Sequence, residues 1–554
     1  MNFDRRANIE RLKNEQFDVL VIGGGITGVG VALDAASRGL RTALVEKDDF
    51  SSGTSSKSSK LIHGGLRYLQ QGEIGLVYEA LHERQRLRKN APHLVHILPF
   101  MIPILTKDGV VSKKIARALG SALWMYDLTG GWRIGKFHRR LKAKDAHKHL
   151  PTMPFEKLGS AYLYYDTAAD DSRLCVTVAR TAVQHGAAIA NQLAVTKIVH
   201  DEAGVARGAI VQPTDGELFT IRATTVVNAA GVWADNVRQA DEGNNPHSIR
   251  PAKGIHITVP WKKVRNDIAI VIPVRRDKRS LFVVPWISNG DGTYQYTYVG
   301  TTDTDFAGGV DESQTSAEDI HYVLEALNQS ITTNVTIDDV TAVWSGLRPL
   351  VRNEDGTTAK GKTADLSRKH KVKVSNSGVI SIMGGKLTTY RKMSEHTVDE
   401  VVKHVGKATK CKTKNLPFIG AKGFKSSMLN GPDAHLAERF GSELGSIKEL
   451  ISKDASLREP LIPGLPYLRA EAVFACRNEM AQTLDDVLSR RTRARIINRR
   501  ATLASARKVA ELLATELHWD AAEIDRQVAF FVDSCSREEA AGLVSEAEFL
   551  ASVQ

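Results

Sequence analysis

Cysteines are scarce in this sequence and form no pattern. Cys175, Cys411, Cys476 and Cys535 are scattered along 554 residues, without the paired spacing that a metal site or a redox motif requires. Isolated cysteines of this kind are typical of a reducing cytoplasm, where buried thiols act as small apolar side chains. We therefore expect a cytoplasmic protein with no metal site.

Long apolar segments are also missing. No apolar run approaches the ~20 residues that a helix needs to cross a bilayer. Residues 1–16 are polar and have no apolar core, which argues against a secretory signal. If the protein works at a membrane, it is expected to lie on the membrane surface.

Acidic residues are outnumbered by basic ones. Lys and Arg total 75 against 63 for Asp and Glu, a formal net charge of +12. This excess favours anionic partners such as nucleic acid, acidic lipids or phosphorylated substrates, and solubility is the alternative explanation. The arginine-rich stretch 482–495 is not accompanied by a helix-turn-helix, zinc or aromatic RNA-binding pattern. We therefore expect no nucleic-acid partner and interpret the stretch as a charged helix face or a subunit contact, as in a homodimer.

Residues 17–46 predict the start of a nucleotide-binding fold. Phe17–Ile22 is a short apolar run typical of a buried parallel strand, residues 29–38 predict a helix, and residues 41–45 predict a second strand. The positive N-terminal end of the helix would point at phosphate groups. This stretch predicts an adenine dinucleotide, either NAD or FAD.

The residues that would hold the dinucleotide follow the G-x-G-x-x-G pattern. Gly23 permits a tight turn, Gly25 lets the backbone approach a pyrophosphate, and Gly28 lets the helix pack closely on the strand. Glu46 ends the second strand, where a carboxylate can accept hydrogen bonds from both ribose hydroxyls of an adenosine.

A serine-rich segment follows and runs into a glycine pair. Residues 53–69 read GTSSKSSKLIHGGLRYL and closely resemble ATSS-x-SSKLIHGGLRYL, the signature of the FAD-dependent glycerol-3-phosphate dehydrogenases. Serine hydroxyls and backbone N–H groups suit the pyrophosphate and the flavin, and the glycine pair would let a flat ring lie against the backbone. The resemblance implies FAD, contacted here by Ser55, Ser58, Ser59, His63, Gly64 and Gly65.

Three later segments extend the resemblance. Residues 225–231 (TVVNAAG) end at Gly231 and resemble the second fingerprint of two-dinucleotide-fold flavoproteins. Residues 339–350 contain the family's SG-[LV]-RPL segment, and residues 379–392 (VISIMGGKLTTYRK) match its last FAD motif, where a helix N-terminus faces the flavin. The cofactor contacts implied there are Gly385, Lys386, Leu387 and Thr388.

The order of the motifs predicts an α/β fold built on a two-dinucleotide-type Rossmann FAD-binding domain. An inserted antiparallel-sheet substrate domain, facing the membrane, and a C-terminal α-helical domain complete it. The assigned ranges are 17–95, 155–245 and 339–405 for the FAD-binding domain, 96–154 and 246–338 for the substrate domain, and 406–554 for the helical domain.

An acidic pair precedes the helix expected after residue 170. Asp170 or Asp171 suits the N-cap, because a carboxylate there accepts a hydrogen bond from a free backbone N–H. The alternative for Asp171 and Arg173 is a place at the rim of the active site, and we favour capping.

The substrate implied by the resemblance is sn-glycerol 3-phosphate, oxidised at its C2 hydroxyl to dihydroxyacetone phosphate. A phosphate dianion requires fixed cations, and Arg67, Arg348 and Lys386 suit this role. Tyr68 is expected to close one wall of the site. Lys386 and the adjacent helix end would stabilise charge on the reduced flavin ring.

The C2 hydroxyl must also lose a proton, which requires a base with a pKa near neutrality. His256 lies in a segment that resembles the KG-x-H segment lining the family's substrate cavity, and it is the expected base. His63 is the reserve, although it could simply pack on the flavin.

Residues 112–126 (SKKIARALGSALWMY) are the candidate for membrane contact. Ile115, Leu119 and Leu123 share one helical face, basic residues cluster at one end, and Trp124 lies near the other. In the family, the corresponding region is thought to dip into the bilayer so that electrons reach quinone. This implies a peripheral protein on the inner face of the cell membrane. Packing of the stripe on the protein's own core is the alternative.

Other functions also fit parts of the sequence. A glycerol-3-phosphate oxidase would reduce oxygen. Such oxidases tend to carry an insertion between the SGLRPL and GGKLTTYRK segments, whereas the corresponding interval in this chain, residues 351–378, is short. A non-catalytic basic protein binding membrane or nucleic acid would hold a flavin that no polyol phosphate reduces. A NAD-linked enzyme is disfavoured because no second Rossmann unit remains for NAD. Without a flavin-tethering motif, FAD is expected to be non-covalent.

Overall fold

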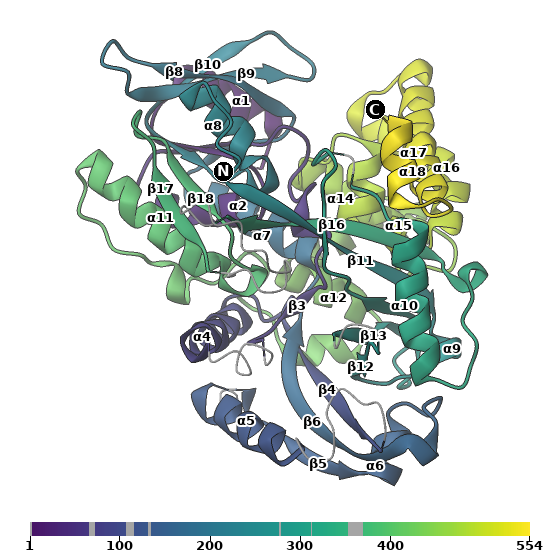
Figure 1. Ribbon diagram of the computed structural model, residues 1–554. Helices are drawn as coiled ribbons and strands as arrows, with labels where there is room; N and C mark the ends of the chain where they lie inside the picture. The colour runs from purple at the N-terminus through teal and green to yellow at the C-terminus, as the bar shows by residue number, and fades with distance from the viewer. Residues whose placement is uncertain are drawn as a thin grey trace.

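A computed structural model of the chain describes residues 3–65, 73–106, 116–130, 134–275, 279–311, 313–352 and 369–553 (Figure 1). Two β-sheets organise this part of the chain, and a group of helices formed by the C-terminal residues lies at the upper right in Figure 1. None of the helices in these ranges combines the length and hydrophobicity that a membrane crossing requires.

The first sheet carries the predicted nucleotide-binding motif. Its strands are β1 (Gln16–Ile22), β2 (Thr42–Val45), β7 (Ala188–Ala190), β8 (Leu193–His200), β9 (Ala206–Pro213), β10 (Phe219–Asn228), β17 (Lys371–Val374) and β18 (Ile380–Met383). The order β18–β10–β1–β2–β7 is parallel throughout, β17 adds an antiparallel edge, and β8–β10 form an antiparallel meander. The parallel core of this sheet is the predicted Rossmann arrangement.

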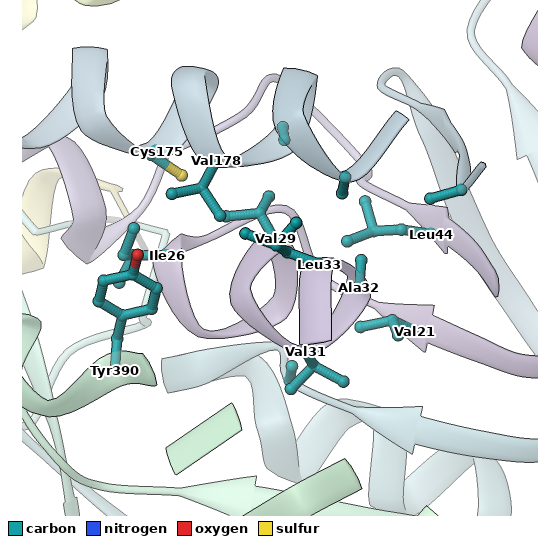
Figure 2. Packing of buried hydrophobic residues seen from close by; sticks show 14 of the residues in the cluster. Val21, Ile26, Val29, Val31, Ala32, Leu33, Leu44, Cys175, Val178 and Tyr390 are labelled. Carbon is teal, nitrogen blue, oxygen red and sulfur yellow. The ribbon is translucent and has the colours of Figure 1, made fainter. Parts of the chain in front are cut away.

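Helices cover this sheet on both sides. They are α1 (Arg5–Asn14), α2 (Ile26–Ser37), α7 (Asp171–Gln184), α8 (Ala234–Glu242) and α11 (Tyr390–Val405). Figure 2 shows side chains of α2 between those of α7, α11 and the strands, all within one buried cluster. Nearly every residue of α2 is buried, which fixes its N-terminal end beside the strand ends.

The second sheet is mainly antiparallel. Its strands are β3 (Leu61–Ile62), β4 (His96–Leu105), β5 (Arg139–Lys142), β6 (Leu158–Ala168), β11 (Ile249–Pro260), β12 (Ala269–Pro273), β13 (Ser280–Ser288), β14 (Tyr294–Gly300), β15 (Thr304–Asp305) and β16 (Ala342–Val351). Around it lie the helices α4 (Ile74–Asn90), α5 (Ala116–Thr129), α6 (Ala143–Lys148), α9 (Trp261–Val264) and α10 (Ala317–Ser330).

Three strands of this sheet, the short β3 and the longer β6 and β16, come from ranges that the sequence assigned to the FAD-binding domain. β6 pairs with β4 over its length, and β16 pairs with β11 from Ile249↔Val351 to Thr258↔Ala342. The two longer strands belong to the second sheet because they form continuous antiparallel hydrogen bonds with β4 and β11. The order of the motifs in the sequence does not reveal this pairing. Both segments thus bring chain from the first sheet directly into the second.

The helix expected at the membrane has its predicted apolar face inside the protein. Leu119 and Leu123 of α5 are buried, in a cluster with Phe100 of β4 and Tyr164 of β6. Burying these side chains on the sheet is favourable in the same way as burying them in lipid. The expected membrane face is therefore wrong for these two residues, and Ile115 lies outside the described residues.

The C-terminal residues form helices, as expected. These are α12 (Ala434–Phe440), α13 (Leu444–Lys453), α14 (Arg469–Asn478), α15 (Ala494–Ile497), α16 (Arg499–Leu517), α17 (Ala521–Ala541) and α18 (Glu546–Val553), with a π-helical turn at Asp486–Arg491. α15 packs against β16, so this domain contacts the second sheet.

Candidate active site

A cavity of ≈ 310 Å³ opens where the parallel strands of the first sheet end. Its wall includes residues at the ends of β1, β2, β10 and β18, the start of α2 and the loop 52–55, and residues of β8, α8, β16 and α11 complete it. Ligands of open parallel sheets bind at this edge. Among the expected cofactor contacts, those that line the cavity are Gly23, Gly25, Glu46, Ser55, Gly231, Gly385, Lys386 and Leu387.

Glycines shape the end of the cavity beside α2, because the backbone there is packed so closely that a Cβ atom would not fit. Gly23 has φ +113°, and a Cβ there would lie 2.7 Å from the carbonyl oxygen of Ala229. A Cβ at Gly28 would lie 1.9 Å from the Gly23 oxygen. The helix N-cap is Gly25, so the positive N-terminal end of α2 meets the cavity, as a bound pyrophosphate requires.

Glu46 lies in the cavity wall at the end of β2. Its Oε2 accepts a hydrogen bond from the Gly24 N–H at 2.6 Å, and its Oε1 accepts one from the Asp48 N–H at 3.0 Å. Burial raises the pKa of this carboxyl to about 7, the two N–H groups oppose the shift, and the carboxylates of Asp48 and Asp49 add to it. This position fits an adenosine ribose, and the raised pKa makes the carboxylate charge depend on pH near neutrality.

The three serines expected at the cofactor point in different directions. Ser55 Oγ accepts a hydrogen bond from the Ile26 N–H at 2.9 Å, at the start of α2. The N–H and Oγ of Ser58 instead donate to Asp171 Oδ2 at 3.0 and 2.7 Å, and Ser59 Oγ lies 2.9 Å from His256 Nε2. The side chains of Ser58 and Ser59 therefore have partners other than a pyrophosphate.

The next expected contacts, His63 and Gly64, are held through their backbone. Thr388 Oγ1 accepts a hydrogen bond from the His63 N–H at 3.1 Å and lies 3.2 Å from the His63 carbonyl oxygen. The Gly64 N–H donates to Tyr126 Oη at 3.1 Å and to Asp166 Oδ1 at 3.3 Å. Tyr126 and Asp166 are thus site-supporting residues that sequence reasoning missed.

His63, Gly64, Tyr126 and Asp166 do not line the ≈ 310 Å³ cavity. Gly65 adopts φ +76°, a conformation that favours glycine. Arg67 and Tyr68, expected at the substrate, lie outside the described residues.

His256 lies on β11, and its ring is 2% exposed. The ring stacks on Trp344 with centroids 4.6 Å apart and planes 8° apart. Burial lowers the pKa of His256 well below its usual value, and the positive charges of Lys60 and Arg348 lower it further. The imidazole is therefore neutral at physiological pH. With Nε2 bonded to Ser59, Nδ1 has no hydrogen-bond partner within the described ranges.

Arg348 lies on β16, opposite Ala252 of β11. Its guanidinium donates to Thr301 Oγ1 at 3.1 Å and to the Thr302 carbonyl oxygen at 3.0 Å, and it pairs with Asp303 at 3.3 Å. A Cβ at Gly254 would lie 2.4 Å from this guanidinium. The glycine of the KG-x-H segment therefore makes room for the arginine of the SGLRPL segment.

Lys386 and Thr388 follow the glycine pair after β18. Gly384 and Gly385 have φ +75° and +87°, and a Cβ at Gly385 would lie 2.3 Å from Met393 Sδ. This turn leads into a 3₁₀ turn, Leu387–Thr389, and then directly into α11, which begins at Tyr390. The N-terminal end of α11 therefore lies behind the cavity wall, as a flavin-binding motif requires.

Comparisons with known proteins show the family of the chain. The family model "FAD dependent oxidoreductase" matches residues 18–391, and "C-terminal domain of alpha-glycerophosphate oxidase" matches residues 411–524. "Glycerol-3-phosphate dehydrogenase 2" of Mycobacterium tuberculosis is 37% identical over 94% of this chain and 88% of its own length. The mitochondrial glycerol-3-phosphate dehydrogenase of Mus musculus is also 37% identical, over 93% of this chain and 72% of its own.

A solved structure is similar over nearly the whole chain. The glycerol-3-phosphate dehydrogenase of Bacillus halodurans, complexed with FAD, aligns with a TM-score of 0.75 and 29% identity, covering 96% of each chain. The chain is thus an oxidoreductase of the FAD-dependent class, and the cavity with its glycine cradle fits FAD. Sequence, fold and site together place the chain in the FAD-dependent glycerol-3-phosphate dehydrogenase family.

Proposed function

We propose that the chain oxidises sn-glycerol 3-phosphate at C2 to dihydroxyacetone phosphate, with FAD as the immediate electron acceptor and membrane quinone as the final one. The observation that carries the proposal is 37% identity to enzymes named glycerol-3-phosphate dehydrogenase over 93–95% of the chain. The same motifs supply a cavity for a dinucleotide and, on the second sheet, a neutral histidine near an arginine.

The cofactor is assigned to the ≈ 310 Å³ cavity. We assign its pyrophosphate to Gly23, Gly25 and the N-terminal end of α2, and its ribose to Glu46. Bound FAD would accept a hydride at flavin N5 and so supply the redox chemistry. Lys386 and the N-terminal end of α11 are assigned to the flavin end, where positive charge favours reduction.

The substrate phosphate is assigned to Arg348, with Arg67, Tyr68 and Lys386 as further members of the site. Arg348 suits the role because Thr301, Thr302 and Asp303 fix its guanidinium before any ligand arrives. A guanidinium fixed in this way binds a phosphate with little loss of side-chain freedom. Lys386 adds a second charge from the first sheet.

The proton of the C2 hydroxyl is assigned to His256. A base must be unprotonated, and the neutral imidazole meets this requirement. If Nε2–H donates to Ser59 Oγ, the lone pair lies on Nδ1, the ring nitrogen to which no described residue forms a hydrogen bond. His63, whose backbone is fixed by Thr388, remains the reserve.

An anaerobic visible spectrum of the purified, FAD-loaded protein tests the substrate assignment. Adding sn-glycerol 3-phosphate should bleach the flavin band, and glycerol, which lacks the phosphate, should not. A flavin band that stays under both conditions would remove the substrate and leave only the cofactor. No flavin band after FAD is supplied would remove the cofactor as well.

The electron acceptor needs its own experiment, because one family model is named after an oxidase. Rates with a soluble quinone analogue and with dissolved oxygen should be compared on the same preparation. The proposal requires the quinone analogue to be the faster acceptor. Faster oxygen consumption would make the chain an oxidase.

We assign membrane contact to the outer face of α5 and the chain that follows it, at the lower end of Figure 1. Trp124, Leu128 and Phe137 are 55%, 68% and 52% exposed, and the rings of Trp124 and Phe137 are 6.3 Å apart. Exposed Lys136, Arg139 and Arg140 lie in the same stretch. Aromatic and apolar side chains beside basic ones suit the surface of an anionic bilayer, here the inner face of the cell membrane.

Cosedimentation with phosphatidylcholine vesicles containing phosphatidylglycerol tests this surface. Leu128→Glu should weaken binding by roughly tenfold, the value of one buried apolar side chain. The matched control is Phe530→Glu, because Phe530 is 59% exposed but lies on α17, in the C-terminal domain. Equal losses in both variants would show that the outer face of α5 has no special role.

A further inference from the structure

The arginine-rich stretch of the C-terminal domain reaches the serine-rich loop 53–60. Arg493, expected on a helix face or a subunit contact, is 1% exposed. Its guanidinium donates to Asp171 Oδ1 at 3.0 Å and also to the carbonyl oxygen of Ser56. A residue of the C-terminal domain therefore contacts the loop 53–60 directly.

Asp171 connects this arginine to the same loop. The helix N-cap is Asp170, which accepts the Arg173 N–H at 3.1 Å, while Asp171, the first residue of α7, accepts the Ser172 N–H at 3.0 Å through Oδ1. The Asp171 carboxylate is fully buried, and its Oδ2 accepts both hydrogen bonds from Ser58. The N-cap prediction is thus confirmed at Asp170, while the Asp171 carboxylate supports Ser58 from inside the protein.

The residues on either side of Ser58 face the two halves of the site. Ser55 lines the cofactor cavity and bonds to the first turn of α2, while Ser59 bonds to His256. The loop is also fixed on its other side, because the Ser58 and Ser59 carbonyl oxygens accept hydrogen bonds from Trp344 Nε1 and Tyr298 Oη at 3.3 and 3.0 Å. The ion pair thus holds the middle of the segment that joins both halves.

The strand side of the site is bound to the same C-terminal stretch. The carbonyl oxygens of Ile496 and Ile497 accept hydrogen bonds from Thr258 Oγ1 of β11 and Thr341 Oγ1, each at 2.7 Å. β11 carries His256, and β16, which begins after Thr341, carries Arg348. Residues 493–497 therefore contact both the loop and the strands that carry the proposed catalytic side chains.

We propose that Arg493 and Asp171 are positioning residues, which fix the loop 53–60 so that Ser55 stays at the cofactor and Ser59 stays at His256. The C-terminal domain is then part of the active site, through a side chain that contacts neither cofactor nor substrate. The effect on substrate oxidation rests on the proposed function, whereas the effect on the loop does not.

The physical basis is the cost of a buried charge without its partner. Removing Arg493 would leave the buried Asp171 carboxylate with less positive charge around it, which is strongly unfavourable. The remaining cation near it, Lys60 Nζ, is 3.8 Å away. Asp171 would have to rearrange, and Ser58 would move with it.

Hydrogen exchange provides the test that needs no bound cofactor. Exchange of residues 53–60 should rise by about tenfold in Arg493→Gln, since the loop loses its anchor. The matched control is Arg180→Gln, because Arg180 joins the same helix α7 to Glu443 of the C-terminal domain at 2.7 and 2.8 Å, away from the loop. Arg180→Gln should leave exchange of residues 53–60 unchanged.

Flavin kinetics provide the second readout. In anaerobic mixing with sn-glycerol 3-phosphate, the flavin of Arg493→Gln should be reduced about tenfold more slowly than the flavin of the unmodified protein, because His256 loses its fixed position beside Ser59. Arg493→Lys, which keeps the charge, should recover part of the rate. Arg180→Gln should match the unmodified protein.

Several outcomes would overturn the proposal. Unchanged exchange of 53–60 in Arg493→Gln would do so, and equal increases in Arg493→Gln and Arg180→Gln would reduce the pair to general stability. If Arg493→Gln does not fold, Ser58→Ala takes its place, since it keeps Arg493 and removes the hydroxyl that donates to Asp171 at 2.7 Å and accepts the Lys60 N–H at 3.0 Å. If the unmodified flavin is not reduced at all, the proposed function fails, and the exchange data still decide the role of the loop.

Discussion

The two walls of the active site are built in different ways. The cofactor wall, on the first sheet, depends on backbone brought close by glycines that are near one another in the sequence, such as Gly23 and Gly28. The substrate wall, on the second sheet, consists of side chains from distant segments, such as Ser59 with His256 and Arg348 with Thr301. The first wall should therefore be sensitive to added atoms, and the second to lost polar partners.

The strongest test of this difference is Gly28→Ala. A Cβ at Gly28 would lie 1.9 Å from the Gly23 carbonyl oxygen, so the turn that cradles the cofactor must move. We expect essentially complete loss of FAD, measured as flavin absorbance per protein. The control is Gly75→Ala, since no atom lies within 4 Å of a Cβ at that position. Normal FAD content in Gly28→Ala would contradict the packing account.

His256→Gln tests the opposite wall. His256 does not line the cofactor cavity, so FAD content should stay near normal. Loss of a general base should lower kcat by about 10²- to 10⁴-fold. Trp344→Phe, which keeps an aromatic surface for the ring to stack on, should have a much smaller effect. A normal kcat in His256→Gln would remove this residue as the base and move the test to His63.

Arg348→Ala should have a smaller effect, concentrated in KM. Hydrogen bonds to a charged phosphate are each worth enough for KM to rise roughly 10- to 100-fold. FAD content should not change, because Arg348 contacts Thr301, Thr302 and Asp303 on the second sheet. Arg348→Lys should recover part of the loss. Unchanged steady-state kinetics in Arg348→Ala would remove Arg348 from the substrate site.

The same contrast explains what could be predicted from the sequence. The strand at 17–22, the glycine positions and Glu46 depend on neighbours within about thirty residues, a range over which patterns of residue type are informative. The structure has the helix at Ile26–Ser37 against the expected 29–38, a small shift at its start.

Long-range pairing was the part that could not be predicted. Nothing local distinguishes Ser55, at the cofactor cavity, from Ser58 and Ser59, which bond to Asp171 and His256 more than one hundred residues away. Leu119 and Leu123 gave an amphipathic pattern that fits lipid or a sheet equally well, and the sheet was the partner. Arg493 looked like surface charge because its partner, Asp171, is 322 residues distant.

Glu46 offers the finest test, since it is the one charged side chain among the expected dinucleotide contacts of β1, α2 and β2. Its pKa in the folded protein is about 7, raised from 4.5 by burial. Ribose hydroxyls need the ionised carboxylate as acceptor, so FAD affinity should fall as pH drops through 7, by about tenfold between pH 8 and pH 6. Stability of the FAD-free protein should change in the opposite direction. Between pH 4.5 and pH 7 the folded protein keeps the Glu46 proton that the unfolded chain has released. The contribution of Glu46 to the free energy of unfolding is therefore lost as pH rises through 7.

Titrating FAD into the apoprotein at several pH values measures the effect. Glu46→Gln cannot ionise, so its affinity should be weaker at pH 8 and nearly independent of pH. Asp48→Asn removes a negative charge that helps to raise the pKa of Glu46, and it should move the midpoint to lower pH without removing the pH dependence. If Glu46→Gln keeps the full pH dependence, another group controls it, and the cofactor wall would then depend on backbone shape alone.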